Sequence, residues 1–412
     1  MKVCVVGSGG REHAFAEALA ETAQVVVTPG SPGIEGSVDT PPEDIDADLF
    51  VVGPEAPLVD GLADRLRAQG RAVFGPGADG ARLEGSKAWM KDLVAAAGVP
   101  TARYGTFDSS QVDAAVAFLA ASVPPYVVKT DGLAAGKGVF VTTDFDEAVD
   151  DVRDKLSGRS FGPAGQRVVI EEGLSGPEAS LFAFCDGRRA VLIPTAAQDH
   201  KRVGDGDTGP NTGGMGCYSP MPTLAAAELD ELMTAAVHPT VEELIRRGID
   251  YRGVLFAGFM LTEDGPRLLE YNVRFGDPEA QVILPRLDVD LAEVLHQAAT
   301  GSLTTELSVS DDAMVTVVCA SEGYPVAPRT GDVIEGIEAA RVLEGVSVFC
   351  AGVSSNESGE LVTAGGRVLD VCGRGPDLAT ARRRAYEGVA CVSWPGMHHR
   401  NDIASTITEV HE

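Results

Sequence analysis

The sequence predicts a multidomain protein of mixed α/β and α+β class. Short apolar segments alternate with helical periodicity over the first hundred residues, whereas the residues beyond about 313 are β-rich and end in a helix, Leu378–Val389. The chain has 412 residues, which is too long for one ordinary core and suits two to four packed domains. Hydrophobic residues make up 44% of it, enough to fill such cores, so extensive disorder is not expected.

The first hundred residues are organised as strands that end in glycine or proline turns. Lys2–Val6 leads into the glycine turn Gly7–Gly10, and Arg11–Ala20 has the apolar spacing of a helix. Ligands of open α/β sheets bind at the carboxyl ends of strands, so these turns are candidate binding positions. Further elements are expected at Val25–Thr28, Leu49–Val52 and Ala72–Phe74, which are strands, and from about Ser86 to Gly98, which is a helix.

An antiparallel pattern follows this region. Val127–Lys129 and Val139–Thr142 are predicted strands on either side of a glycine-rich turn. Residues 199–220 are crowded with Gly, Asp and Thr and have no periodicity, so we expect a structureless loop, which at this length is usually functional. The other predicted elements are the strands Arg167–Glu171, Ala179–Cys185 and Arg189–Thr195, the helix Leu224–Arg247, and the hairpin strands Val254–Leu261 and Arg267–Val273.

Charge and cysteine content restrict the possible partners and compartment. The formal net charge is −28, which argues against a nucleic-acid partner because such a surface needs a basic field. The seven cysteines are odd in number and form no C-x-x-C pair, which indicates reduced thiols in a cytoplasmic protein and no structural zinc. The N-terminus leads directly into a strand, and no apolar run approaches the roughly 20 residues of a membrane span, so neither a signal peptide nor a membrane partner is expected.

The glycine-rich segment Asp131–Gly138 is the first candidate site. It has three residues between Gly132 and Gly136, where a Walker phosphate loop needs four, and a glycine follows its lysine where that loop has Ser or Thr. It also lies between two strands and does not open a helix. We interpret it as a hairpin turn whose backbone N–H groups fold over a polyphosphate, assisted by Lys129 and Lys137. An ordinary hairpin turn is the alternative.

The second candidate site is a row of polar side chains on one strand. Because strand side chains alternate between faces, Glu270, Asn272 and Arg274 should share one face. A carboxylate and an amide oxygen suit Mg²⁺, and the arginine could stabilise a transferring phosphoryl group. A half-solvated edge strand is the alternative. The opposite, core-facing side is expected to hold Leu269, Tyr271 and Val273.

The third candidate site runs from Gln198–Arg202 to Asp207–Gly216. Its polar groups and glycines allow close backbone approach to a small ligand. A surface loop is the alternative, and His200 could equally belong to a basic anion pocket.

The fourth candidate site, Gly7–Glu12, imitates a dinucleotide-binding fingerprint. Glu12 stands where the third glycine belongs, and the second strand is not followed by a ribose-binding acid, so NAD binding is disfavoured. The helix N-terminus still offers an anion site for a phosphorylated sugar. Plain strand–turn–helix packing is the alternative.

In their order along the chain, the four elements resemble the phosphoribosylamine–glycine ligase family of ATP-grasp enzymes, over nearly the whole chain. The run 198–216 is specific to this ligase among ATP-grasp enzymes, although Pro29-Gly30-Ser31 departs from the Pro-Gly-Asn that is common in the family. The matching motifs are GSGGREHA at 7–14, GPEAPLVDG at 53–61, LEGSKA at 83–88, DGLAAGKGV at 131–139, QDHKRVGDGDTGPNTGGMG at 198–216, EYNVRFGDPE at 270–279, RTGDVI at 329–334 and GGRVL at 365–369.

The resemblance implies a particular domain order. A Rossmann-like N-terminal domain would span 1–100, and a central ATP-grasp region would span 101–305, with a mobile lid at about 103–172. A small β-rich C-terminal domain would span 306–412. The resemblance also implies a monomer.

The implied reaction joins glycine to 5-phosphoribosylamine in purine biosynthesis, with ATP as co-substrate and Mg²⁺ or Mn²⁺ as cofactor. The glycine carboxylate would attack the γ-phosphate of ATP to give glycyl phosphate, and the amine would then attack the activated carbonyl. Two alternatives stay open. One is another ATP-grasp carboxylate–amine ligase or carboxylase with a different acceptor, and the other is a catalytically silent ATP-binding or regulatory protein.

The resemblance also implies residue roles. Glu270 and Asn272 would bind the metal, and Val254–Leu261 contains no carboxylate, so any further ligand is expected from elsewhere or from water. The catalytic residues would be Arg274, Asp199 and Lys129. ATP would be bound by Lys87, Lys129, Gly132, Gly136, Lys137, Gly138, Glu171, Leu174 and Glu178. The substrates would be bound by Gly9, Gly10, Gly53, Pro54, Glu55, Asp199, Gly213, Gly214, Met215 and Arg274.

Overall fold

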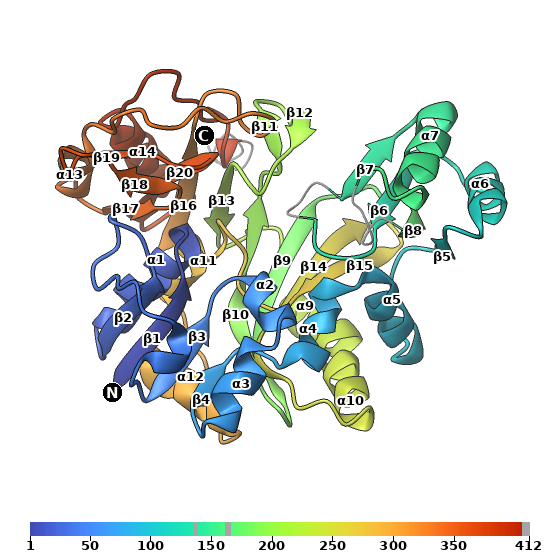
Figure 1. Ribbon diagram of the computed structural model, residues 1–412, viewed down its shortest axis with the longest axis horizontal. Helices are drawn as coiled ribbons and strands as arrows, with labels where there is room; N and C mark the ends of the chain where they lie inside the picture. The colour runs from blue at the N-terminus through green and yellow to red at the C-terminus, as the bar shows by residue number, and fades with distance from the viewer. Residues whose placement is uncertain (135–137, 161–165, 406–412) are drawn as a thin grey trace.

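The N-terminal region forms a four-stranded parallel sheet of order β2-β1-β3-β4 (Figure 1). The structure is a computed structural model that describes residues 1–134, 138–160 and 166–405. The middle strands are almost wholly buried, as expected for parallel strands covered on both faces. The predicted strands are confirmed as β1 (Lys2–Gly7), β2 (Gln24–Pro29), β3 (Leu49–Val52) and β4 (Ala72–Phe74).

The helices of this region follow the predicted order. Helix α1 (Gly10–Ala20) begins directly after the turn that ends β1. Helix α5 (Lys87–Ala96) begins at Ser86, whose hydroxyl accepts a hydrogen bond from the Trp89 N–H and so satisfies a free donor of the first turn. The others are η1 (Pro42–Asp44), α2 (Glu55–Val59), α3 (Leu62–Ala68) and α4 (Ala78–Gly85).

A second, antiparallel sheet of order β5-β8-β6-β7 stands at one side of the molecule, opposite the C-terminal region (Figure 1). Two helices, α6 and α7, pack against it and give it a separate core that includes Leu119, Val128 and Val152. Its elements are β5 (Tyr104–Asp108), α6 (Val112–Ala120), β6 (Tyr126–Thr130), β7 (Val139–Thr142), α7 (Phe145–Leu156) and β8 (Arg167–Glu172).

An eight-stranded antiparallel sheet of order β15-β14-β9-β10-β13-β16-β20-β17 runs through the centre. Strands from the middle of the chain form one half of it, and C-terminal strands continue it without a break. Its members are β9 (Glu178–Asp186), β10 (Ala190–Asp199), β13 (Gly216–Ser219), β14 (Arg252–Thr262), β15 (Gly265–Asn272), β16 (Ala313–Ala320), β17 (Val346–Cys350) and β20 (Arg367–Gly375).

The remaining helices cover this sheet. The predicted long helix is confirmed, with a π-helical turn in its middle, as α9 (Ala226–Leu232), η2 (Met233–Val237) and α10 (His238–Arg246). Among the described residues, no helix has the length and apolar content to cross a bilayer. The others are α11 (Ala280–Ile283), η3 (Leu284–Arg286), α12 (Leu291–Thr300), α13 (Ile337–Arg341) and α14 (Leu378–Val389), beside a small β-ribbon of β18 (Val353–Ser355) and β19 (Leu361–Thr363).

The prediction of a structureless loop at residues 199–220 is wrong. Strand β10 continues to Asp199, β11 (Arg202–Gly204) pairs with β12 (Thr208–Asn211), and β13 lies in the central sheet between β10 and β16. The β11–β12 hairpin is partly exposed and β13 is entirely buried. None of these three strands therefore has the alternating apolar pattern by which a half-buried strand is recognised.

The expected inward face of β15 also needs a correction. The register shifts between Gly258 and Phe259, which pair with Glu270 and Leu268, so Leu269 is an extra residue in a β-bulge. Leu268 therefore takes the core position predicted for Leu269, beside Tyr271 and Val273. A bulge breaks the two-residue period, which sequence alternation alone cannot detect.

Helix α14 packs so closely on the sheet that Gly388 has no room for a methyl group. A Cβ there would lie 2.7 Å from Val371 Cγ1 and 2.8 Å from Val346 Cγ1. We predict that Gly388→Ala lowers the free energy of unfolding by about 1 kcal/mol, because overpacking costs about 1–3 kcal/mol and the gain in helix propensity returns only about 1 kcal/mol. Urea denaturation measures this difference. An increase in stability would contradict it, and the exposed change Arg383→Ala on the same helix serves as the control.

Candidate active site

Two lysines and one carboxylate are buried together between α5 and the small antiparallel sheet. Glu171 Oε1 on β8 lies 3.1 Å from Lys91 Nζ and 3.0 Å from Lys129 Nζ, as ion pairs. All three side chains are less than one-tenth exposed. Burial lowers the pKa of Lys91 to about 8, although Glu171 opposes the shift. Since one carboxylate faces two ammonium groups, the cluster keeps a positive charge that suits an anionic ligand such as a phosphate chain.

Lys91 is a member of this cluster that sequence reasoning missed. It lies four residues after Lys87 on the same face of α5, and that helical spacing was the available signal. The backbone of Glu171 and Leu174 was expected to meet adenine, which stays a prediction.

The start of the glycine-rich segment is fastened to the N-terminus of α5. Asp131 Oδ1 accepts hydrogen bonds from Ser86 Oγ at 3.0 Å and from the Ala88 N–H at 3.1 Å. Lys87 Nζ donates to the carbonyl of Gly132 at 3.2 Å. The segment thus begins beside Lys87, as its predicted role requires. Of the other residues expected to bind ATP here, Gly138 is described, whereas Gly136 and Lys137 lie outside the described residues.

The charges of lysines from three separate parts of the chain act on Glu270. Burial opposes its charged form, but Lys201, Lys129 and Lys87 together outweigh that effect and lower the pKa of Glu270. The carboxylate is therefore ionised and able to bind a cation. Asn272 follows two positions later on β15.

A divalent cation fits this donor set. Carboxylate and amide oxygens are hard ligands, and Mg²⁺ commonly takes only one or two protein groups together with phosphates and waters. Among the described residues, no three His, Cys, Asp or Glu side chains gather as a metal site. Phosphate and water oxygens would have to complete the coordination.

Arg274 is largely buried between two carboxylates from the N-terminal region. Its Nε lies 3.2 Å from Glu55 Oε2, and its Nη2 lies 2.7 Å from Glu84 Oε1. Burial acts to raise the pKa of Glu55, but Arg274, a backbone hydrogen bond and Arg11 together outweigh it, and the pKa is lowered. Burial raises the pKa of Glu84. The structure thus joins two predicted site residues, Glu55 and Arg274, and adds Glu84, which sequence reasoning quoted only within the motif LEGSKA.

Asp199 lies at the end of β10 with its Oδ1 buried and without a hydrogen-bond partner in the described part of the chain. Burial and the nearby Glu279 raise its pKa well above the usual range. Gly214 has φ +117°, and a Cβ there would lie 2.8 Å from Asp199 Oδ1. Gly214 therefore lies directly against Asp199, as a shared pocket requires, while the Met215 side chain is fully buried.

Lys201 extends from the same region toward Glu178, with which it forms a short ion pair. Glu178 was expected to hold the ribose of ATP. Its pairing with Lys201 connects that position to residues 198–216, the third candidate site, which we call the substrate loop.

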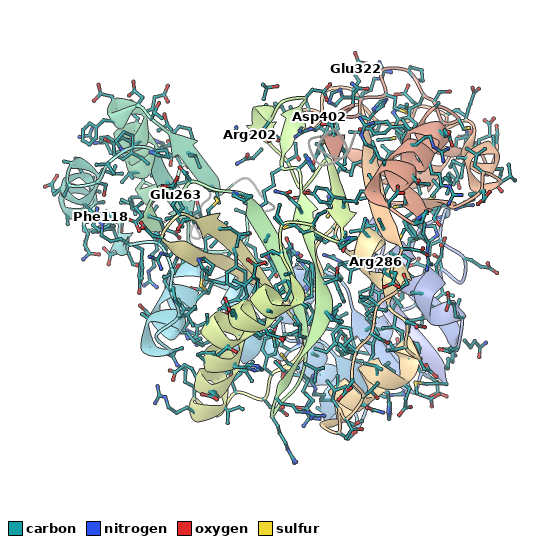
Figure 2. The ribbon with its side chains drawn as sticks, turned by 180° about the vertical axis from the view of Figure 1, so that it is seen from behind. Phe118, Arg202, Glu263, Arg286, Glu322 and Asp402 are labelled. Atoms are coloured by element: carbon teal, nitrogen blue, oxygen red, sulfur yellow. The ribbon has the colours of Figure 1, made fainter. Side chains whose placement is uncertain are left out.

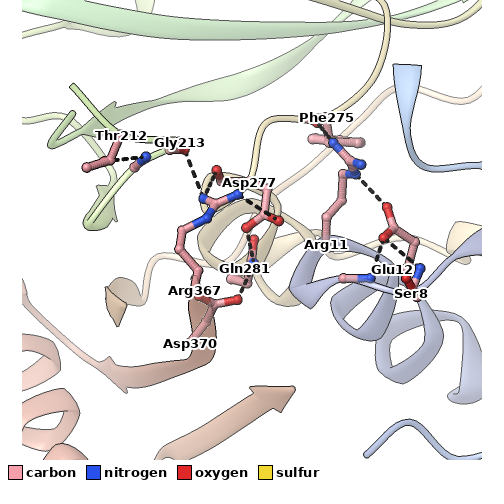
Figure 3. A network of polar contacts seen from close by, with 12 residues as sticks. Ser8, Arg11, Glu12, Thr212, Gly213, Phe275, Asp277, Gln281, Arg367 and Asp370 are labelled. Carbon is pink, nitrogen blue, oxygen red and sulfur yellow. Dashed lines mark hydrogen bonds and ion pairs between the residues drawn. The ribbon is translucent and has the colours of Figure 1, made fainter. Parts of the chain in front are cut away.

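At the start of α1, the carboxylate of Glu12 occupies the position where a dinucleotide fingerprint has its third glycine (Figure 3). Its Oε2 accepts hydrogen bonds from the N–H groups of Ser8 and Gly9, at 3.1 and 2.7 Å. A Cβ on Gly53 would lie 2.0 Å from Glu12 Oε1. Glu12 therefore satisfies the donors with which a dinucleotide-binding turn holds a pyrophosphate, in agreement with the rejection of NAD.

A cavity of about 450 Å³ opens beside Glu12 at the carboxyl ends of β1 and β3. Gly10 does not line it, since Gly10 is packed against Asp370 of β20 and Gln281. The cavity is lined by Val6, Gly7, Ser8, Glu12, Thr28, Pro29, Pro42, Glu43, Pro54, Pro57, Leu62 and Arg65.

Arg367 links the C-terminal strands to the substrate-loop residues (Figure 3). Its Nη1 donates to the carbonyls of Gly213 and Asp277, at 2.9 and 2.6 Å, and its Nη2 lies 3.3 Å from Asp277 Oδ2. Gln281 Nε2 donates to both Asp277 Oδ1 and Asp370 Oδ2, at 2.9 and 2.8 Å. Sequence reasoning missed this network, although Arg367 lies in the motif GGRVL, Asp277 lies in the motif EYNVRFGDPE, and Gly213 was a predicted site residue.

The two sheets, the buried lysines and the hard-oxygen pair on β15 together define an ATP-grasp ligase, an enzyme class that uses ATP and a divalent metal ion to form a bond. Within that class, the chain belongs to the phosphoribosylglycinamide synthetase family. The family's N domain matches residues 1–84, its ATP-grasp (A) domain 85–280, and its C domain 314–406.

Curated relatives and solved structures agree with this family. The phosphoribosylamine–glycine ligase of Brucella melitensis is 45% identical over 98% of this chain and 97% of its own length. That of Streptomyces coelicolor is 47% identical over 98% and 99%. The crystal structure of the Thermotoga maritima enzyme is 34% identical and covers 98% of this chain and all of its own, with a TM-score of 0.84. A biotin carboxylase domain from Hydrogenobacter thermophilus, 17% identical with a TM-score of 0.72, shares the fold.

The buried carboxylate of Asp370 makes a pH prediction possible. Burial, together with the neighbouring Asp277, raises the pKa of Asp370 to about 7. In the unfolded chain this group loses its proton near its ordinary pKa of 3.8, whereas the folded protein keeps the proton up to about pH 7. The contribution of Asp370 to the stability of the folded state is therefore fully present below pH 3.8 and is lost as the pH rises toward 7.

We predict that Asp370→Asn, which cannot ionise, becomes more stable relative to the unmodified protein as the pH rises from 5 to 7.5, by on the order of 1–3 kcal/mol. Urea unfolding of both proteins across this range measures the difference. A difference that does not change with pH would mean that Asp370 is already charged at pH 5.

Proposed function

We propose that the protein ligates glycine to 5-phosphoribosylamine, forming glycinamide ribonucleotide, ADP and phosphate in purine biosynthesis. The observation that carries this proposal is the convergence of Lys87, Lys129 and Lys201 on Glu270. These residues come from α5, β6 and the start of the substrate loop, so the nucleotide side and the substrate side of the site meet at one carboxylate. The names of the relatives, which are 45–47% identical over nearly the whole chain, support the same substrates.

The chain's own residues would position the reactants. Lys87 and Lys129 would neutralise the phosphates of ATP, with Glu171 and Leu174 at the adenine and Glu178 at the ribose. Glu270 and Asn272 would hold Mg²⁺ or Mn²⁺, which when bound offsets the charge of the phosphate chain. Arg274 would stabilise the charge that develops on the transferred phosphoryl group. No protein nucleophile is required, so catalysis is mainly positioning and charge neutralisation.

The reaction would proceed in two displacements. A glycine carboxylate oxygen attacks the γ-phosphorus of ATP, the bond from that phosphorus to the β–γ bridging oxygen breaks, and ADP leaves. The amine of phosphoribosylamine then attacks the carbonyl carbon of glycyl phosphate. The carbon–oxygen bond to phosphate breaks, and the amine nitrogen loses a proton. Asp199, Gly213 and Gly214 would line the glycine side, while Gly53, Pro54 and Glu55 would meet phosphoribosylamine.

We also propose that the protein works as a monomer in the cytoplasm. Its seven cysteines are all free, and six of them are buried, which supports a reducing compartment. The charge of −28 supports the absence of a nucleic-acid partner.

An assay for glycinamide ribonucleotide tests the proposal. Purified protein with ATP, Mg²⁺, glycine and freshly generated phosphoribosylamine should form this product with stoichiometric ADP. The same assay with other amino acids and amines separates the alternative, an ATP-grasp ligase with a different acceptor. Faster ADP release with another acid–amine pair than with glycine and phosphoribosylamine would overturn the assignment.

We predict that Glu270→Gln lowers turnover at least about 100-fold, as the loss of an electrostatic contact to a transition state typically does. Glutamine keeps the size and shape of glutamate, so the fold should persist although three lysines lose a counter-charge. Steady-state kinetics with a thermal unfolding control measures both effects. Near-normal glycine-dependent ADP release would disprove the metal assignment.

A further inference from the structure

The β11–β12 hairpin cannot hold its own position. Its two strands, of three and four residues, share only the pairs Arg202–Asn211 and Gly204–Thr208, with an irregular register between them. An isolated two-stranded hairpin is at best marginally stable in water, even when it is longer than this. Its turn also contains Asp207 at φ +52°, a conformation that non-glycine residues seldom adopt. Contacts from elsewhere must therefore fix the hairpin.

Those contacts come from the C-terminal segment His398–Asp402, which we call the C-terminal clamp. Arg400 is 1% exposed, and its Nη1 donates to Asp207 Oδ1 at 2.7 Å and to the carbonyl of Arg202 at 3.1 Å. Asp402 holds Arg400 through both carboxylate oxygens, each at 2.7 Å. One buried guanidinium therefore joins the start of β11 and the hairpin turn to the clamp.

Further hydrogen bonds reach β11 and the hairpin turn, and Figure 2 labels Arg202 and Asp402 in this part of the molecule. The Gly206 N–H donates to Asp402 Oδ2 at 2.7 Å. The backbone N–H and the side-chain amide of Asn401 both donate to the carboxylate of Asp205, at 2.8 and 3.0 Å. His398 Nε2 lies 2.8 Å from the carbonyl of Val203. Almost two hundred residues separate the partners, so this contact belongs to the tertiary fold and not to the local hairpin.

The hairpin is rigidly connected to the proposed glycine pocket. The carbonyl of Lys201 accepts hydrogen bonds from the N–H and the hydroxyl of Thr212, at 2.8 and 2.9 Å. The same hydroxyl accepts a hydrogen bond from the Gly214 N–H at 3.0 Å. Arg202, whose carbonyl Arg400 holds, is the next residue after Lys201. A displacement of the hairpin would therefore move both Lys201 and Gly214.

We infer that Arg400 is a positioning residue for the ligase reaction, which sets the hairpin so that Lys201 and the Gly213–Gly214 backbone lie at the glycine side of the site. Arg400 touches no reacting atom. It acts through Asp207 and the carbonyl of Arg202. This inference rests on the proposed function, because it takes Asp199, Gly213 and Gly214 as the glycine pocket.

The test uses two substitutions on opposite sides of the contact, Arg400→Met and Asp207→Asn, with their double mutant. Each single change should raise the KM for glycine about tenfold or more, while the KM for ATP changes much less. Both changes break the same contact, between Arg400 and Asp207. The increase in the KM for glycine in the double mutant should therefore be much smaller than the product of the two single increases. The control is Glu344→Gln, which breaks an exposed ion pair with Arg384 in the same domain and should leave all constants unchanged.

A second measurement keeps the inference testable if Arg400→Met folds poorly. Asp207 is 69% exposed, so Asp207→Asn should not threaten the fold. Limited trypsin digestion should cut after Lys201 or Arg202 several-fold faster in Asp207→Asn than in Glu344→Gln, since release of the hairpin opens those bonds to the protease. Unchanged cleavage would show that the clamp does not hold the hairpin.

The outcomes separate this inference from the proposed function. Failure of the unmodified protein to form glycinamide ribonucleotide would refute the proposed function itself. Product formation with an unchanged KM for glycine in both folded single mutants would overturn only the role of Arg400. A fall in thermal stability with an unchanged ratio of the two KM values would likewise overturn it, because a merely structural residue would give that result.

Discussion

The rest of this structure depends on one constraint. Charged lysine side chains are buried beside fewer carboxylates than would neutralise them. The chain has a net charge of −28, so an anionic substrate can approach only where positive charge is concentrated locally. Lys91 and Lys129 share the single carboxylate of Glu171, and the charges of Lys87, Lys129 and Lys201 together lower the pKa of Glu270. Burying an ammonium group is costly, and the lowered pKa of Lys91 reflects that cost. The cluster remains partly uncompensated, which is the state that a phosphate chain with its metal ion would relieve.

The division of labour between regions follows from the sheets. The small antiparallel sheet, with its own core, supplies Lys129 and Glu171, and the central sheet supplies Glu270 and Asn272. The C-terminal strands extend that central sheet and supply Arg367, whose guanidinium holds the carbonyl of Gly213. The C-terminal region therefore holds substrate-loop residues in position through hydrogen bonds, although it contributes none of the predicted metal or ATP ligands.

Local patterns were enough to predict most of the fold. Apolar runs that end in glycine or proline turns marked β1 to β4, and strand alternation placed Glu270 and Asn272 on one face. The pattern failed where structure is not periodic. The bulge at Leu269 shifted the core position to Leu268, and hydrogen bonds to distant segments ordered β11, β12 and β13 without any apolar alternation.

The sequence motifs that form the site could be predicted, but the contacts between residues of different motifs could not. Arg274 meets Glu84 from 190 residues away, and Arg367 meets Gly213 from 154 residues away, so no local spacing could reveal either contact. Lys91 was missed because its only signal was a helical spacing of four residues from Lys87. Glu12 was noticed as a departure from a dinucleotide fingerprint, and only the fold shows that its carboxylate satisfies the donors at the start of α1.

Calorimetric titration of ATP and of AMP into the unmodified protein and into Lys129→Met, each with Mg²⁺, tests the central claim most directly. If the buried lysines bind the phosphate chain, Lys129→Met should weaken ATP binding about tenfold or more, the usual cost of one hydrogen bond to a charged group, and should leave AMP binding nearly unchanged. Equal losses for both nucleotides, or no loss for ATP, would contradict the account.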